Sequence, residues 1–282
     1  MLRPWLLLLA LASAASAQEV VRFPGADGFE LEARLVAASS ADAPVAICLH
    51  QYRSDKDAWR PLLPALQEAG FTTLALDQRA HGGSKKRGDE TVDVAQVPRE
   101  EFGALLRRGP EDVKAALAWL RSKGHAAKQV VLLGASYGCS VALLTHAQVP
   151  EVQALVLLSP GEEYFGVDVR PALNAWSGPL LVVSLTGDSL HPTAKALLTQ
   201  CVEAHRSDDR GPRWHWVEYE ADGHGTSVLE LRETPSGVQQ SAADRRPTTD
   251  ELFALDDPRR LIVTWLVEGA GLGTAPRDAG RR

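Results

Sequence analysis

The sequence predicts an α/β fold in which a mostly parallel central sheet carries helices on both faces. After residue 43, short apolar runs alternate with segments of helical spacing, which is typical of parallel strands joined by helices. The run "APVAICLH" at 43–50 is continuously apolar, as expected for a strand that is buried on both faces. The 282 residues, 45% of them hydrophobic, can form one large core, and neither a repeat nor a linker divides them.

The first half of the chain is predicted to contain an antiparallel edge hairpin (20–23 and 29–37), a strand (43–50), a helix (57–69), a strand (71–77), a polar segment without periodicity (78–109) and a helix (111–123). The hairpin follows from alternating residues on both sides of the turn "GADG". Gly70 ends the first helix and Pro110 opens the second, in the positions that these residues favour.

The second half continues the alternation with a strand (129–136), a helix ending near His146, strands (153–160 and 178–188), a helix (194–205), a strand (213–220) and a closing amphipathic helix (258–268). The connection from Ser159 to Pro179 is short, so we expect no large lid domain. The segment 225–256 receives no assigned role. The tail over 269–282 lacks apolar periodicity and is predicted to be disordered.

The first 17 residues are predicted to be a secretory signal peptide. Arg3 supplies the positive charge, residues 5–11 form an apolar stretch too short to span a bilayer, and "ASA" at 15–17 fits the small-residue cleavage pattern. An uncleaved membrane anchor or a buried strand is the alternative. We expect a periplasmic or secreted protein whose main domain covers 18–268, with no stable membrane anchor after cleavage.

Ser136 is the candidate nucleophile. In "VVLLGASYGCSVALL" (130–144) it stands between Gly134 and Gly138, where the predicted strand becomes a helix. A G-x-S-x-G pattern in this setting holds the serine in a strained, exposed position, and the two glycines avoid side-chain clashes. The helix that follows directs backbone N–H groups toward developing negative charge. A tight structural turn is the alternative interpretation.

A serine nucleophile needs a histidine base and a carboxylate that orients it. The histidines that follow are His146, His191, His205, His215 and His224. His224 is the preferred base because it lies in the glycine-flanked turn "ADGHGTS" after the last strand, whereas His215 has a structural role in its strand.

Asp188 is the preferred acid because it closes the segment 178–188, directly beyond the apolar run of that strand. The rival acids are Glu162, Glu163, Asp168 and Asp222, and a turn-forming role for Asp188 is the alternative.

Two N–H donors are needed to stabilise the oxyanion. The backbone of Tyr137 supplies one, and the loop after strand 43–50 supplies the other, with Tyr52 as first choice and Gln51 as second. We expect His50 to brace this loop.

The cysteines are expected to have no catalytic or metal-binding role. No Cys/His spacing suggests a metal site. Cys48 and Cys139 are expected to be buried, and Cys201 makes the count odd, which leaves at least one free thiol or an intermolecular bond.

The sequence resembles the α/β-hydrolase superfamily, in particular secreted or dienelactone-hydrolase-like serine hydrolases, over about residues 20–268. "LALDQRAHGGS", "GASYGCS", "LTGD" and "DGHG" match its strand-end segment, nucleophile elbow, acid loop and histidine loop in order. Two features depart from it: His-Gln replaces His-Gly before the oxyanion loop, and Ser136 stands where dienelactone hydrolases carry cysteine. The resemblance implies hydrolysis through an acyl-enzyme, without a cofactor. The serine at this position argues for a small-molecule ester or a related acyl substrate.

Other functions remain open at this point. A peptidase or an acyltransferase would share the site, and a binding protein could keep the fold without the chemistry. The net charge of −6 and the lack of a basic stripe argue against a nucleic-acid partner.

Overall fold

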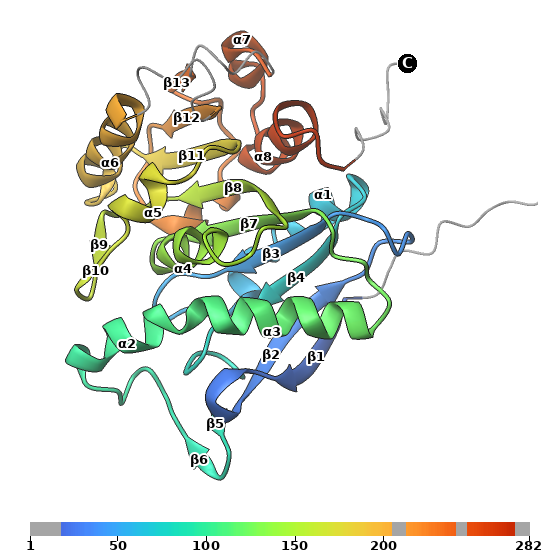
Figure 1. Cartoon of the computed structure of the whole chain (residues 1–282). Helices are drawn as coiled ribbons and strands as arrows, with labels where there is room; N and C mark the ends of the chain where they lie inside the picture. Colours follow the sequence, from blue (N-terminus) through green and yellow to red (C-terminus); the bar gives the residue numbers. More distant parts are fainter. Residues whose placement is uncertain (1–17, 205–212, 241–246, 274–282) are drawn as a thin grey trace, which may run out of the picture.

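The computed structural model describes residues 18–204, 213–240 and 247–273, without the side chains of 201–204. The predicted signal peptide, His205, the Cys201 side chain and most of the predicted disordered tail lie outside this description. In the described part, an eleven-stranded sheet runs in the order β13-β12-β11-β8-β7-β3-β4-β2-β5-β6, with β1 paired to β2 (Figure 1).

The parallel centre consists of β3 (Val45–Leu49), β4 (Thr72–Leu76), β7 (Val130–Ala135), β8 (Val152–Leu158), β11 (Leu180–Leu185) and β12 (Trp214–Tyr219). The antiparallel strands at its two edges are β1 (Glu19–Pro24), β2 (Phe29–Val36), β5 (Lys86–Arg87), β6 (Glu90–Thr91) and β13 (Gly237–Gln240). The predicted N-terminal hairpin is therefore confirmed. A separate small hairpin joins β9 (Glu163–Tyr164) to β10 (Val167–Asp168).

The α-helices are α1 (Leu63–Glu68), α2 (Phe102–Arg107), α3 (Gly109–Ser122), α4 (Tyr137–His146), α5 (Arg170–Asn174), α6 (His191–Ala204), α7 (Thr249–Phe253) and α8 (Pro258–Thr264). Single 3₁₀ turns occupy Ala26–Gly28, Lys56–Trp59, Arg99–Glu101 and Gly225–Glu230, and a π-helical turn, Trp265–Gly269, continues α8. In Figure 1, α3 and α4 cross the face of the sheet that is turned to the viewer.

Two apolar layers hold the helices to the sheet. Along β3, Ile47 belongs to the layer shared with α3, α4 and α6, whereas Cys48 belongs to the layer shared with α1, α7 and α8. Successive side chains of a strand point to opposite faces, so one continuously apolar strand serves both layers. This explains why "VAICL" carries no polar residue.

The structure corrects three expectations. The single helix predicted over 57–69 is a 3₁₀ turn followed by α1, because Pro61 and Pro64 lack the N–H groups that a continuous helix needs. The polar segment 78–109 contains β5, β6 and α2, which were not predicted. The segment 225–256, left without a role, supplies a 3₁₀ turn, β13 and α7.

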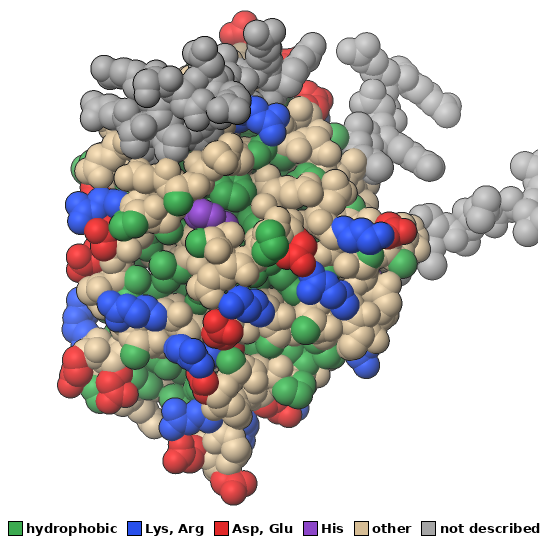
Figure 2. All heavy atoms as spheres, in the orientation of Figure 1, with side chains coloured by type: hydrophobic (Ala, Val, Ile, Leu, Met, Phe, Trp, Pro, Cys, Tyr) green, Lys and Arg blue, Asp and Glu red, His purple; other side chains and the backbone are tan. Residues whose placement is uncertain are grey.

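No helix of the described residues has the length and apolarity needed to cross a membrane. Within the same residues, no cluster of histidine, cysteine and acidic side chains is arranged to hold a metal ion. Cys48 and Cys139 are buried free thiols, as expected. Acidic and basic side chains are intermixed on the face seen in Figure 2, without a stripe of one sign.

Candidate active site

Ser136 lies at the junction of β7 and α4, in the strained conformation that the motif predicts, but it is buried at 4% exposure and not exposed as we expected. Its backbone has φ 50° and ψ −115°, and its N–H donates to the Leu158 carbonyl at 2.9 Å. A sparsely populated backbone conformation of this kind costs a residue with a side chain about 1–3 kcal/mol. The neighbouring strand must therefore hold Ser136 in place, and strain of this kind is typical of functional positions.

The flanking glycines are required by close backbone contacts. A methyl group at Gly138 would lie 2.1 Å from the Leu49 carbonyl oxygen, and one at Gly134 would lie 2.6 Å from the Cys139 nitrogen. Both neighbours are backbone atoms that cannot move aside. The prediction that these glycines avoid side-chain clashes is confirmed.

Asp188 and His224 form a hydrogen-bonded pair. His224 Nδ1 lies 2.7 Å from Asp188 Oδ2, and the Asp188 side chain is only 2% exposed. The other carboxylate oxygen accepts the Leu190 N–H at 2.9 Å. Because Nδ1 faces a carboxylate, it carries the proton, and Nε2 of the neutral ring is left as an acceptor. The imidazole is 36% exposed and can thus meet an incoming molecule.

The loop that carries His224 is tied to the strand ends around Ser136. The Gly225 N–H donates to Ser159 Oγ at 3.0 Å, and a methyl group at Gly225 would lie 3.5 Å from Ala135 Cβ. These contacts bring together the carboxyl ends of β7, β8 and β12, which point to the same side of the molecule in Figure 1.

The Ser136 hydroxyl itself bonds to a residue that the sequence analysis did not identify. Among the described residues, its hydrogen-bond partner is the hydroxyl of Tyr164, with 3.1 Å between the two oxygens, and not His224. The structure therefore joins Asp188 to His224 and places their loop beside the serine. It does not show a hydrogen bond between the serine and the imidazole.

The predicted oxyanion residues lie around the same strand ends. Tyr137 is the first residue of α4, and Tyr52 follows β3. Their backbone N–H groups take no part in the backbone hydrogen bonds that the described residues form. The side chain of Gln51 bonds to Thr226 Oγ1 at 2.9 Å, so it connects the β3 loop to the histidine loop.

His50 supports the loop that follows β3 through two hydrogen bonds. Its Nδ1–H donates to the Gln51 carbonyl at 2.8 Å, and its Nε2 accepts the Gln78 N–H at 3.1 Å. Burial lowers the pKa of His50 to about 3, with a smaller contribution from His81 in the same direction. A neutral, fully bonded imidazole agrees with the bracing role that we expected.

The segment "DQRAHGGS" has a supporting role in the described structure. The Asp77 carboxylate accepts the Lys56 and Gly83 backbone N–H groups, both at 2.6 Å. Arg79 forms a buried two-point ion pair with Asp112, at 2.6 and 2.7 Å. These bonds fix the loop that follows β4 and leave its charged groups internally paired.

Three of the rival residues are engaged elsewhere. His191 pairs with Glu218 at 3.1 Å. His215 accepts the Trp265 indole N–H at 2.9 Å, which supports its predicted structural role. Asp168 forms an exposed pair with the arginine two residues further on. We retain Asp188 as the candidate acid and His224 as the candidate base.

Aromatic rings cluster around Phe165, next to the tyrosine that bonds to Ser136. Phe165 contacts Phe102 at 4.9 Å and Tyr52 at 5.2 Å between ring centres, and it also lies near Tyr137 and Tyr164. Both residues of the hairpin turn, Phe165 and Gly166, have positive φ, at 53° and 74°. A glycine at the second position is the usual signal for such a turn, and it could have revealed the hairpin from the sequence.

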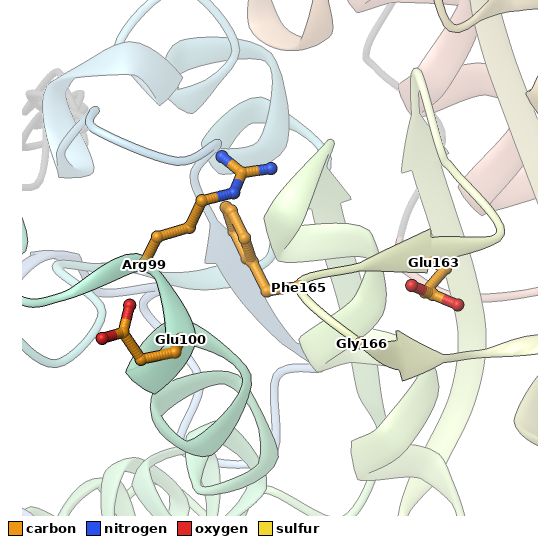
Figure 3. A pocket seen from close by; sticks show the side chains of 5 residues that line it. All are labelled: Arg99, Glu100, Glu163, Phe165 and Gly166. Carbon is orange, nitrogen blue, oxygen red and sulfur yellow. The ribbon is translucent and has the colours of Figure 1, made fainter.

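A groove of about 530 Å³ lies beside this hairpin and is lined by Arg99, Glu100, Glu163, Phe165 and Gly166. Figure 3 shows the Arg99 side chain running alongside the Phe165 ring, whereas the carboxylates of Glu100 and Glu163 lie on opposite sides, away from this pair. The Arg99 guanidinium carbon is 5.3 Å from the ring centre. The groove therefore shares the Phe165 ring with the aromatic cluster near Ser136.

Comparisons with known proteins agree with this architecture. A family model described as alpha/beta hydrolase fold matches residues 44–183. The esterase Pf2001 of Pyrococcus furiosus superposes with a TM-score of 0.57 at 19% identity, covering 76% of this chain and 84% of that one. Est1E from Butyrivibrio proteoclasticus, whose structure holds ferulic acid, gives 0.56 at 17% identity, covering 72% and 90%.

Curated relatives match over shorter stretches. Epoxide hydrolase A of Mycobacterium tuberculosis is 34% identical over 129 residues, which are 43% of this chain and 39% of the relative. Epoxide hydrolase B of the same organism is 25% identical over 190 residues, 58% of this chain and 53% of the relative. The matched region thus spans between about two fifths and just over half of these relatives.

Fold and strand-end geometry define an α/β protein built around a strained serine elbow. The chain belongs to the α/β-hydrolase superfamily. The finer likeness to dienelactone hydrolases finds no support among these comparisons.

Proposed function

We propose that this protein is an exported serine hydrolase that cleaves a carboxylic ester of a small molecule. Ser136 is the nucleophile, His224 the base and Asp188 the group that orients it. The observation that carries the proposal is the strained serine at the end of β7, together with the hydrogen-bonded carboxylate–imidazole pair in the loops that follow β11 and β12. A serine hydroxyl becomes an effective nucleophile only with such a pair beside it.

In the proposed reaction, the Ser136 hydroxyl leaves Tyr164 and turns to Nε2 of His224. As its oxygen attacks the ester carbonyl, the proton passes to the imidazole, and Asp188 stabilises the imidazolium that forms. The N–H groups of Tyr137 and Tyr52 receive the oxyanion. His224 then protonates the departing alcohol, and a water molecule activated by the same ring releases the acid.

The epoxide hydrolases among the relatives suggest a second reaction, but the nucleophile favours esters. Attack of a serine oxygen on an epoxide would leave an ether on the enzyme. An ether has no carbonyl for water to attack, so the enzyme could not complete its cycle. An acyl-serine, in contrast, is an ester that the same base and oxyanion donors can hydrolyse.

The aromatic approach favours a flat, apolar group next to the scissile bond. Tyr52 and Phe165 are only partly buried, whereas Phe102 and Tyr137, whose rings contact them, are buried. The groove beside Phe165 has room for a more polar part of the substrate, since its volume lies within the usual range for ligand sites.

The decisive experiment compares the wild type with Ser136→Ala. We expect the wild type to hydrolyse p-nitrophenyl esters and to react with a fluorophosphonate probe, and the variant to do neither while keeping its circular dichroism spectrum. Undiminished hydrolysis in the variant would refute the proposal. Amides, acceptor alcohols and styrene oxide in the same assay test the peptidase, acyltransferase and epoxide alternatives. A mature N-terminus at Gln18 would support export.

A further inference from the structure

We propose that Tyr164 is an additional catalytic residue, whose phenol O–H donates a hydrogen bond to a substrate oxygen on the tetrahedral carbon. The proposal rests on the proposed function, because it concerns the intermediate formed at Ser136. It assigns to the β9–β10 hairpin a chemical role besides shaping the site.

The starting observation is a hydrogen bond between two hydroxyl groups at the serine. Ser136 Oγ and the Tyr164 hydroxyl oxygen lie 3.1 Å apart, and either hydroxyl can be the donor because each carries a proton. One hydrogen bond uses only one of these two protons. A phenol donor therefore lies within hydrogen-bond distance of the reacting oxygen.

Catalysis changes what each hydroxyl can do. Before the reaction, either hydroxyl can supply the proton of the shared hydrogen bond. Once the serine proton has passed to His224, only Tyr164 has a proton to give. Tyr164 then acts as a donor toward the negative oxygens that gather around the new bond. A hydrogen bond that strengthens after proton transfer stabilises the transition state more than the ground state, and it thereby raises kcat.

The phenol is held in a fixed position for this role. Val167 pairs with Tyr164 across the hairpin, and a methyl group at Gly161 would lie 3.0–3.1 Å from the phenol ring. Burial also raises the pKa of the Tyr164 hydroxyl. The group therefore stays protonated through the neutral and mildly alkaline range, and it donates a hydrogen bond without giving up its proton.

The test is Tyr164→Phe, which removes one oxygen and keeps the ring. Tyr219→Phe is a matched control, because Tyr219 is fully buried and its hydroxyl has no hydrogen-bond partner in the described structure. Both variants are assayed with p-nitrophenyl, phenyl and ethyl acetate, together with thermal unfolding.

We expect Tyr164→Phe to lower kcat by about 10²-fold, the usual effect of losing one such donor, with KM changed less than about threefold. Tyr219→Phe should keep the wild-type kcat. Two patterns would support the proposal. A loss that grows from p-nitrophenyl to ethyl acetate assigns the bond to the leaving oxygen, and an equal loss for all three esters assigns it to the oxyanion.

Two outcomes would overturn the proposal, and they are distinguishable. If the wild type is active but Tyr164→Phe is equally active or faster with every ester, Tyr164 only holds the resting serine and this inference alone is wrong. If the wild type neither hydrolyses esters nor reacts with a fluorophosphonate, the proposed function is wrong and the role of Tyr164 falls with it.

Discussion

Replacing Asp188 by Asn tests the catalytic pair without disturbing its shape. The carboxylate is almost fully buried and accepts two hydrogen bonds, one from His224 Nδ1–H and one from the Leu190 N–H. An amide can keep the second bond through its oxygen. Its NH₂ group then faces Nδ1 and donates to it, so the ring carries its proton on Nε2 and cannot take one from Ser136.

The same exchange in a well-characterised triad lowers kcat by about 10⁴, which corresponds to about 5.5 kcal/mol at 1.36 kcal/mol per factor of ten. We expect a loss of this size in the steady-state hydrolysis of a p-nitrophenyl ester, with little change in melting temperature. Asp168→Asn is the control, because this rival acid forms only an exposed surface pair. An Asp188→Asn variant that keeps more than about a tenth of the wild-type kcat would contradict the role of Asp188 as the orienting acid.

Three further predictions concern stability and selectivity. Gly138→Ala should destabilise the protein by about 3 kcal/mol or more in urea unfolding, because its methyl group meets the Leu49 carbonyl. Gly88→Ala, with φ 57° but open space, should cost only about 1–2 kcal/mol, and equal losses would contradict this reasoning. Phe165→Gly relieves a positive φ but removes an aromatic ring, so the preference for phenyl acetate over ethyl acetate should fall. Phe253 is partly exposed, and Phe253→Ala should leave this preference unchanged. The pKa values of His50, His81 and His146 are lowered in the folded state, chiefly by burial, so the unfolded chain binds more protons below about pH 6.5. The free energy of unfolding should therefore fall as the pH drops from 6.5 to 5, by at most about 1.4 kcal/mol per pH unit for each histidine. A urea-unfolding midpoint that stays constant over this pH range would argue against neutral buried imidazoles.

The parallel centre of the sheet could be predicted because its strands are apolar on both faces. The run ending at Leu49 and the run ending at Ala135 pair directly in the sheet, with Leu49 opposite Gly134. Burial alone specifies such strands, and their order along the chain limits how they connect. The candidate residues could then be chosen as the polar side chains that follow these strand ends.

The small elements were missed because they depend on tertiary contacts. β5 and β6 contain two residues each and are exposed, so no apolar period marks them. The short helix α2 was hidden in a polar segment, although its inward residues Phe102 and Leu106 are buried against the rest of the chain. A helix of six residues has little stability by itself. The local sequence pattern therefore does not predict where such a helix forms.

Tyr164 shows why the triad could be proposed from sequence while the hydrogen-bond partner of its serine could not. Ser136, Asp188 and His224 each follow a strand whose position is fixed by the core, so backbone connectivity alone brings them to one edge. Tyr164 reaches the same edge through a hairpin of two-residue strands that has no core of its own. Its hydroxyl nevertheless bonds to the Ser136 hydroxyl. The proposed nucleophile is therefore contacted by a segment that sequence patterns describe as a simple connection, and the proposed triad alone leaves this contact out.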